Sequence, residues 1–377
     1  APASALKAAL LVLDLLTRAR GAGTGDLPGV ELLGERAAAA GLSRQAPFSV
    51  GGAFRFVRAA DGWAGINLAR PSDLEVVPAL VQGSPHAEPW AAVEAWALTR
   101  SADSIAERAQ LLGVPAAPLQ ASHPPGLPVA AHRRGARPPR AAPLVVDLTS
   151  LWAGPLCGHL LALTGCRVVK VESTRRPDGA RLGAPGLYDL LHCGHESVAL
   201  DFTDLDDLAR LRKLLASADV VLEASRPRAL RQLGIEAEHL VAAGATWASI
   251  TAYGRTGAWS NRVGLGDDVA AAAGLVADRE GDPWPAGDAL ADPLTGVHAA
   301  AAVAASLLAG GGFLLDISMY GVAAAAAALT RDSGVAHPHG AGWVVDGVPV
   351  SQPRARRPSG TAAELGADTK AVLGELA

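Results

Sequence analysis

The chain of 377 residues is poor in aromatic and sulfur-containing residues, and these shortages limit what it can be. Aromatic residues make up 4% of it, and a formal net charge of −4 at pH 7 gives no reason to expect nucleic acid or an acidic membrane surface as a partner. Three cysteines (Cys157, Cys166 and Cys193) are an odd number without close pairing, which suits a reducing cytoplasm better than a disulfide scaffold. No basic segment precedes an apolar stretch at the start, so we expect a soluble protein without a secretory signal.

Several catalytic and cofactor-binding motifs are also missing. There is no G-x-S-x-G elbow of a serine hydrolase and no phosphate-binding P-loop. Glu172 ends a predicted strand, where a dinucleotide-binding fold keeps a ribose-binding acid, but the G-x-G-x-x-G fingerprint is reduced to Gly154 and Gly158. His192-Cys193-Gly194-His195 contains metal-binding residue types without a second cluster at ligand spacing, so we expect no metal site. Nucleophilic chemistry by a carboxylate is then the most economical hypothesis.

Composition changes along the chain predict two lobes, as expected for its length. The predicted parts are an N-terminal helical segment (1–48), a small α+β lobe (49–121), a Pro/Arg-rich linker (122–143), a large domain (144–330) and a tail with a closing helix (331–377). The linker is too rich in Pro, Gly and Arg for regular structure, and we interpret its basic residues as solvated rather than phosphate-binding.

Hydrophobic patterns predict the elements within these parts. Residues 5–17 predict a mostly buried helix, whereas residues 54–58 and 63–68 alternate around an Asp-Gly turn and predict a β-hairpin. Helices are expected at 73–81, 90–98 and 104–112. After residue 143, apolar strands alternate with helices, which predicts a parallel sheet covered on both faces. The fold class is therefore α/β, with a Rossmann-like large domain beside a smaller α+β lobe.

The segment 296–315 is apolar enough to suggest a membrane span. Alanine contributes little to insertion, and His298 and three successive glycines interrupt the stretch. We expect a buried helix, a glycine turn and a strand instead.

Two acidic positions precede alanine-rich helices. Asp292 stands before Pro293, so it could merely cap the helix; a carboxylate in so apolar a setting, however, either bonds backbone donors or has a chemical task. Asp267 and Asp268 follow a glycine in the same way, and we expect one of them to cap and the other to be exposed.

Taken in order, seven blocks of the chain resemble the family III CoA-transferases of the CaiB/BaiF type. The blocks are Val146-Asp147-Leu148 with Ala153-Gly154-Pro155, Gly165 to Glu172, His195 to Asp201, Ala218 to Gly234, Ala248 to Gly254, Gly266-Asp267-Asp268, and Ala291-Asp292 to Gly296 with Phe313 to Ser318. They cover roughly residues 143–325. The segment resembling the family's small domain, with Ala59 to Trp63 in its hairpin, precedes this region, so the order of the lobes resembles a permuted one.

The resemblance implies that Asp292 is a nucleophile that attacks an acyl-CoA thioester and then carries CoA as an aspartyl thioester. It implies an acyl-CoA and a carboxylic acid acceptor as partners, an interlocked homodimer and no tightly bound cofactor. Backbone N–H groups near Ala153-Gly154 or Tyr253-Gly254 could stabilise the oxyanions. The implied substrate or CoA contacts are Trp152, Ala153, Gly154, Ser173, Ala224, Ser225, Arg231, Thr251, Tyr253, Gly254 and Asp267.

The chain departs from the family pattern at several of these blocks. His195-Glu196 replaces a basic pair, Ala224-Ser225 replaces Asn with an aromatic residue, and Gln232 replaces an arginine, so fewer cationic contacts to CoA are expected. Two alternatives stay open. One is an α-methylacyl-CoA racemase-like isomerase, against which the Gly266-Asp267-Asp268 block lacks the expected His of the proton-transfer pair. The other is a catalytically silent protein of the same fold that binds CoA or a partner.

Overall fold

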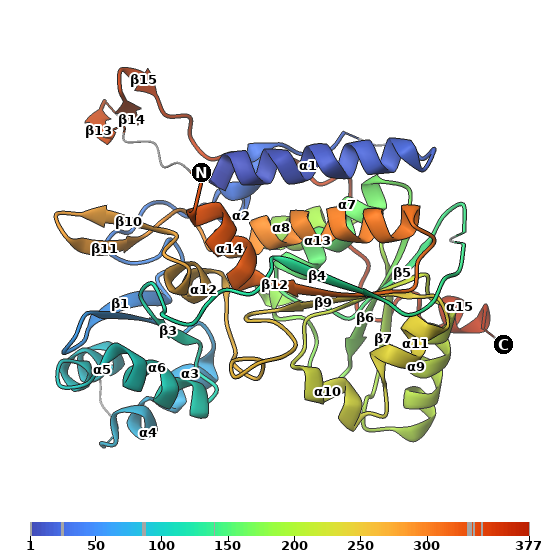
Figure 1. Ribbon diagram of the computed structural model, residues 1–377, viewed down its shortest axis with the longest axis horizontal. Helices are drawn as coiled ribbons and strands as arrows, with labels where there is room; N and C mark the ends of the chain where they lie inside the picture. The colour runs from blue at the N-terminus through green and yellow to red at the C-terminus, as the bar shows by residue number, and fades with distance from the viewer. Residues whose placement is uncertain are drawn as a thin grey trace.

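The computed structural model describes residues 2–23, 26–84, 88–138, 140–329, 334, 336–340 and 342–376. Its centre is a seven-stranded sheet with the order β4-β12-β9-β8-β5-β6-β7 (Figure 1). The six strands other than the edge strand β4 (Val129–Arg133) run parallel to one another, and the chain order reverses between β5 and β8. In chain order the parallel strands are β5 (Leu144–Asp147), β6 (Arg167–Ser173), β7 (Glu196–Leu200), β8 (Val220–Glu223), β9 (Thr246–Thr251) and β12 (Phe313–Ser318). In open sheets of this kind, ligands bind beyond the carboxyl ends of the strands near such a reversal.

Helices cover both faces of this sheet, as the alternation of strands and helices predicts. Side chains alternate between the faces: Val145 and Leu222 belong to one core cluster, and Val146 and Val221 belong to the other. The first cluster includes α1 (Pro2–Ala19), α7 (Ala153–Leu163) and α13 (Ala291–Leu308). The second includes α9 (Leu205–Ser217), α11 (Ala237–Ala242) and α15 (Thr369–Gly374). Figure 1 shows α1, α7 and α13 on one side of the sheet and α9 and α11 on the other.

The N-terminal helix is less buried than its composition suggests. Leu6 and Leu13 of α1 are fully buried against the core that includes α13, but Leu11 and Leu15 are more than half exposed. The prediction of a mostly buried helix is therefore wrong for one face of α1. A 3₁₀ turn η1 (Val30–Leu33) and the short helix α2 (Glu35–Ala39) follow.

The small α+β lobe forms around the predicted hairpin. Strands β1 (Phe54–Arg58) and β2 (Trp63–Asn67) are antiparallel, and β3 (Ala116–Pro118) completes their sheet. The expected helices are α3 (Pro71–Glu75) with α4 (Val77–Val81), α5 (Pro89–Ala97) and α6 (Ala102–Leu111). The lobe's exit joins the large domain at α12 (Gly266–Ala272), where the Gln120 N–H donates to the Ala271 carbonyl at 3.0 Å.

The segment 122–143 is more ordered than expected of a linker. Residues Val129–Arg133 form β4, the antiparallel edge strand beside β12. Among the basic residues interpreted as solvated, Arg137 and Arg140 contact Asp219 at 3.5 and 3.3 Å. The prediction of an irregular linker is wrong, because a strand can pair at a sheet edge despite nearby prolines that would break a central one.

The apolar segment 296–315 forms the expected helix, glycine turn and strand. Helix α13 ends at Leu308, and Gly310 to Gly312 all have positive φ before β12 begins at Phe313. By length and composition α13 is the one helix in the described part of the chain that could cross a membrane. Most of it is buried in the protein, between α1, α7 and the sheet, as expected of a core helix.

The remaining elements surround this core. They are η2 (Gly179–Leu182), α8 (Pro185–His192), α10 (Pro227–Gln232), β10 (Val276–Arg279), β11 (Asp282–Pro285), α14 (Met319–Ala327), β13 (Ala336–His339), β14 (Gly342–Val345) and β15 (Val348–Pro349). The chain then returns along the large domain, where the Asp368 carboxylate accepts from the Ser197 N–H of β7. The closing helix α15 is shorter than the predicted 362–376.

Candidate functional site

The carboxyl ends of the parallel strands bring most of the predicted contact residues to one edge of the sheet. Trp152, Ala153 and Gly154 follow β5, Ser173 ends β6, Ala224 and Ser225 follow β8, and Thr251, Tyr253 and Gly254 end or follow β9. Arg231 lies exposed on α10, which also follows β8. Helix α13 is followed by β12, so the end of α13 lies at the amino ends of the parallel strands. Because α13 packs against the sheet and runs in the opposite direction to β12, the start of α13, with Asp292, lies toward the carboxyl ends of the strands, as these residues do.

Asp292 does not cap its helix. Helix α13 begins at Ala291, its cap position is Leu290, and no side chain caps it. Asp292 is the second residue of the helix, and its own N–H donates to the Ala289 carbonyl at 2.9 Å. The interpretation of Asp292 as a cap of its own helix is therefore wrong, and its carboxylate instead accepts a hydrogen bond from the Gly266 backbone at the start of α12.

Three aspartates meet around this position. Asp267 is the second residue of the neighbouring helix α12 and accepts a hydrogen bond from the Ala289 N–H at 3.1 Å. Asp288 is 2% exposed in the loop before α13. Gly266 lies against Asp292: a Cβ at residue 266 would meet Asp292 Oδ2 at 2.2 Å and the Ala289 carbonyl oxygen at 2.5 Å. Only glycine lets the two helix starts approach so closely.

The expectation that one of Asp267 and Asp268 makes a capping contact is confirmed, and the expectation that the other is exposed is wrong. Asp268 Oδ1 accepts the Leu265 N–H at 2.9 Å, which is a capping contact. Asp267 is not exposed but half-buried, because it faces the loop that precedes α13.

Arg36 of α2 supplies a positive charge to the three aspartates. Its guanidinium pairs with both carboxylate oxygens of Asp288, one of them at 3.1 Å, and lies 5.3 Å from the ring centroid of Trp152. Sequence reasoning missed Arg36, because it lies more than two hundred residues from Asp288 in a short alanine-rich segment without a motif.

Burial and like charge weaken the acidity of the cluster. Burial first, and then the charges of Asp267 and Asp288, raise the pKa of Asp292 to about 7, against the opposing effects of Arg36 and a hydrogen bond from the Gly266 backbone. Burial and Asp288 raise the pKa of Asp267 to about 6, and burial raises the pKa of Asp268 well above its usual range. Near neutral pH the site therefore holds both ionised and protonated carboxyl groups.

The expected backbone donors are partly occupied. The Gly254 N–H already donates to Thr251 Oγ1 at 2.8 Å, and stabilisation of an oxyanion by backbone N–H groups near Ala153-Gly154 or Tyr253-Gly254 stays a prediction. Gly154 serves close packing, since a Cβ there would meet the side chain of Thr149 at 2.2 Å. Among the described residues, the indole N–H of Trp152 and the hydroxyl of Tyr253 are buried polar groups without a hydrogen-bond partner, and these side chains are candidate donors instead.

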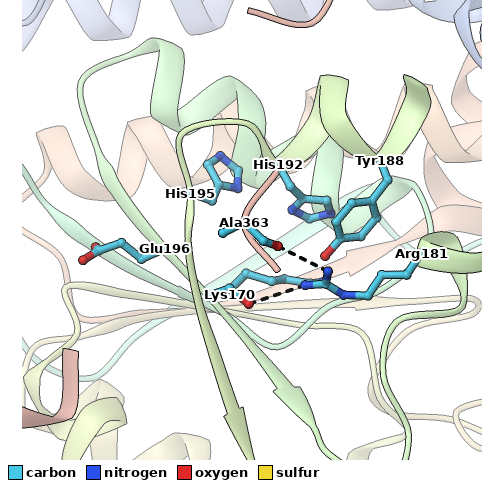
Figure 2. A pocket seen from close by; sticks show the side chains of 8 residues that line it. Lys170, Arg181, Tyr188, His192, His195, Glu196 and Ala363 are labelled. Carbon is cyan, nitrogen blue, oxygen red and sulfur yellow. Dashed lines mark hydrogen bonds between the residues drawn. The ribbon is translucent and has the colours of Figure 1, made fainter. Parts of the chain in front are cut away.

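A second polar cluster lies beneath α8 (Figure 2). Glu172, considered above as a ribose-binding acid, is 5% exposed and paired with Arg181 at 2.6 Å. Lys170, 1% exposed, contacts Asp178 at 3.1 Å. Figure 2 shows Arg181 beside Tyr188 and bonded to the Ala363 carbonyl of the returning chain. Because Glu172 is held by its own neighbours, the dinucleotide interpretation loses its ribose-binding group.

His195 and Glu196, which stand where the family pattern has a basic pair, do not lie at the candidate site. Glu196 begins β7, so it lies at the amino ends of the parallel strands and not at the carboxyl ends, and it pairs with Arg167 at 2.6 Å. His195 is 5% exposed, and neither of its ring nitrogens has a partner among the described residues. The departure at this block therefore removes no cation from the site that Asp292 occupies within this chain.

Other predicted contacts have structural partners of their own. Ser225 donates from its hydroxyl to Glu223 at 2.7 Å, and the Ser173 hydroxyl accepts the Arg175 N–H at 3.3 Å. Contact of Ser173, Ala224, Ser225 or Arg231 with CoA stays a prediction.

Comparison with known proteins identifies the family of the region that contains this site. The model of "CoA-transferase family III" matches residues 143–341. A succinate–glutarate CoA-transferase of Agrobacterium fabrum is 28% identical over 211 residues, 50% of this chain and 53% of that protein. A succinyl-CoA–D-citramalate CoA-transferase of Chloroflexus aurantiacus is 31% identical over 206 residues, 49% of this chain and 50% of the relative. The chain thus spans about half the length of the curated relatives it matches.

Solved structures give a weaker comparison. A Mycobacterium tuberculosis protein in an orthorhombic crystal form is 32% identical, covers 56% of this chain and 64% of its own, and superposes with a TM-score of 0.49. The family assignment therefore rests on the sequence match.

Proposed function

Because the chain belongs to CoA-transferase family III, we propose that it transfers coenzyme A from an acyl-CoA to a carboxylic acid, with Asp292 as the nucleophile. The observation that supports this role is the carboxylate itself. It lies at the start of a core helix without capping it, next to two further acids and one arginine. A buried carboxylate that is costly to ionise and does not cap its own helix is a candidate for chemistry.

The proposed reaction begins with attack by the ionised Asp292 carboxylate on the thioester carbonyl carbon. The C–S bond breaks, which leaves a mixed anhydride and a CoA thiolate. The thiolate attacks the side-chain carbonyl of Asp292 and expels the donor acid, so that CoA is held as an aspartyl thioester. An acceptor carboxylate repeats the two steps in reverse, leaves with CoA and restores the Asp292 carboxylate. Each oxyanion needs hydrogen-bond donors, and among the described residues the Trp152 indole N–H and the Tyr253 hydroxyl are buried donors without a partner.

Trapping the enzyme intermediate tests this proposal. The protein is incubated with succinyl-CoA, treated with hydroxylamine or borohydride, and digested for mass spectrometry. We expect a hydroxamate or a reduced side chain at Asp292, and none in Asp292→Asn. An unmodified Asp292 together with measurable CoA binding would refute the transferase and favour the catalytically silent CoA-binding alternative.

One specific observation supports the racemase-like alternative. The objection to it was a missing histidine in the Gly266-Asp267-Asp268 block, but Asp267 supplies a titratable carboxyl in that place, beside Asp292, with a pKa of about 6. Two carboxyl groups of unequal pKa could act as base and acid on the carbon next to a thioester. Deuterium uptake at that carbon in D₂O, without any acceptor acid, would support isomerisation; its absence alongside an Asp292 adduct would exclude it.

The proposal also covers the oligomeric state of the enzyme, its compartment and its cofactor requirement. The family resemblance supports a homodimer, and size-exclusion chromatography with light scattering tests it. Cys157, Cys166 and Cys193 are free thiols, which supports a reducing compartment such as the cytoplasm. No tightly bound cofactor is needed for the proposed steps, because the CoA thioester is the substrate.

A further inference from the structure

The positive charge at the candidate site comes from outside the region that matches the family. That match spans residues 143–341, whereas Arg36 belongs to α2 in the N-terminal segment. Its guanidinium makes a two-point contact with Asp288 and stacks near Trp152. Arg36 therefore touches both the acidic cluster and the residue that precedes α7.

Helix α2 is also held through Glu35, the residue next to Arg36. Glu35, 1% exposed, pairs with Arg356 of the returning chain through three hydrogen bonds of 2.7 to 3.1 Å. Arg356 also bonds His159 of α7 at 2.9 Å. Two adjacent residues, Glu35 and Arg36, thus connect the N-terminal segment with the C-terminal tail and with the acids of the site.

We propose that Arg36 is a positioning residue for the CoA-transfer reaction, which keeps the Asp292 carboxylate ionised and in place through its contact with Asp288. This inference rests on the proposed function of Asp292. It assigns a role to a segment that the family match does not cover.

The charge balance of the cluster explains why one arginine matters. Among the described residues, the charged groups acting on the Asp292 carboxyl are Arg36 on α2, Asp267 and Asp268 on α12, and Asp288 in the preceding loop. Arg36 is the cation in this set, and it opposes the ionisation cost imposed by burial. Without it, Asp288 loses its partner and adds an uncompensated negative charge beside Asp292.

A merely structural ion pair makes a different prediction from a positioning residue. If Arg36 only held α2 in place, Arg36→Gln and Asp288→Asn would both destabilise the fold and leave the ionisation of Asp292 unchanged. If Arg36 sets the charge, the two substitutions act in opposite directions. Arg36→Gln makes Asp292 harder to ionise, and Asp288→Asn makes it easier, because Asp288 raises the pKa of Asp292.

The experiment titrates Asp292 directly in the whole 377-residue chain labelled with ¹³C at the aspartate carboxyl carbon, with the Asp292 resonance assigned by its loss in Asp292→Asn. An arginine close to an aspartate lowers its pKa by about one to three units, so we expect the midpoint to rise by at least about one unit in Arg36→Gln. We expect Arg36→Lys to fall between Arg36→Gln and wild type, and Asp288→Asn to titrate below wild type. Arg58→Gln is the matched control, because Arg58 lies 5.1 Å from the Trp63 ring centroid in the small lobe.

Adduct formation with succinyl-CoA is measured across the same pH range. We expect its midpoint to follow that of Asp292 in every variant, with roughly tenfold less adduct near pH 6 in Arg36→Gln and recovery at higher pH. An unchanged Asp292 midpoint in folded Arg36→Gln, or the same direction of change in Arg36→Gln and Asp288→Asn, would overturn the inference about Arg36. Normal titration shifts without any adduct in wild type would instead overturn the transfer reaction, and with it the catalytic purpose of Arg36.

Discussion

Replacing Asp292 by Asn should abolish acyl-enzyme formation and, in addition, stabilise the fold in a pH-dependent way. The folded pKa of about 7 lies above the ordinary value of 3.8, so the folded state binds the proton more tightly than the unfolded state. The contribution of this proton to stability is fully present below the unfolded pKa and is lost progressively as pH rises from there through the folded pKa. Ionised Asp292 therefore destabilises the native protein at neutral and alkaline pH.

The magnitude follows from the two pKa values. At pH 8 the unfolded carboxyl is ionised and the folded one largely so, and about three units of pKa difference correspond to about 4 kcal/mol. At pH 5 the folded group is protonated, and the difference is only about 2 kcal/mol. The advantage of Asp292→Asn over wild type in free energy of unfolding should therefore grow by about 2–3 kcal/mol from pH 5 to pH 8.

Urea denaturation of both proteins at several pH values measures this difference, with Asp282→Asn, at an exposed carboxylate on β11, as the control. The control should differ from wild type by a small amount that does not depend on pH in this range. A difference between Asp292→Asn and wild type that stays constant from pH 5 to pH 8 would refute the raised pKa, and with it the account of a carboxylate held at an energetic cost for catalysis.

The other predictions concern neighbours of Asp292 and the second polar cluster. Asp267→Asn removes a negative charge that raises the pKa of Asp292, so the midpoint of adduct formation should fall; a rise, followed by mass spectrometry across pH, would contradict the assigned coupling. Gly266→Ala should eliminate the adduct, because the new Cβ would meet Asp292 Oδ2 at 2.2 Å, whereas Gly186→Ala, with no atom within 4 Å of its Cβ, should behave like wild type in the same assay. Lys170→Met leaves buried acids without their cation and should lower the free energy of unfolding in urea by about 3–5 kcal/mol; a loss below about 1 kcal/mol would show that the buried pair contributes little.

Local sequence patterns were sufficient for much of the architecture. Alternation around an Asp-Gly turn predicted β1 and β2, and apolar strands alternating with helices predicted a sheet covered on both faces, because these features depend on periodicity and turn chemistry within short windows. The glycine run after α13 predicted its turn for the same reason, since positive φ is accessible to glycine at little cost. The ordered blocks identified the family region and singled out Asp292.

Features that depend on distant partners needed the tertiary structure. Strand β4 was missed because its pairing with β12 joins segments about 180 residues apart, and no local pattern records such a partner. The exposure of Leu11 and Leu15 on α1 was missed because composition cannot say which face of an apolar helix another helix covers.

The same distinction between local pattern and distant partners applies to the candidate site. The sequence by itself determined which carboxylate lies in the first turn of the core helix and which residues follow the parallel strands. Only the tertiary structure decided that Asp292 does not cap α13, that Asp267 and Asp288 lie beside it, and that Arg36 brings the balancing charge. The physical reason is that the charge state of a buried carboxylate depends on every group around it, and here those groups come from three separate stretches of the chain.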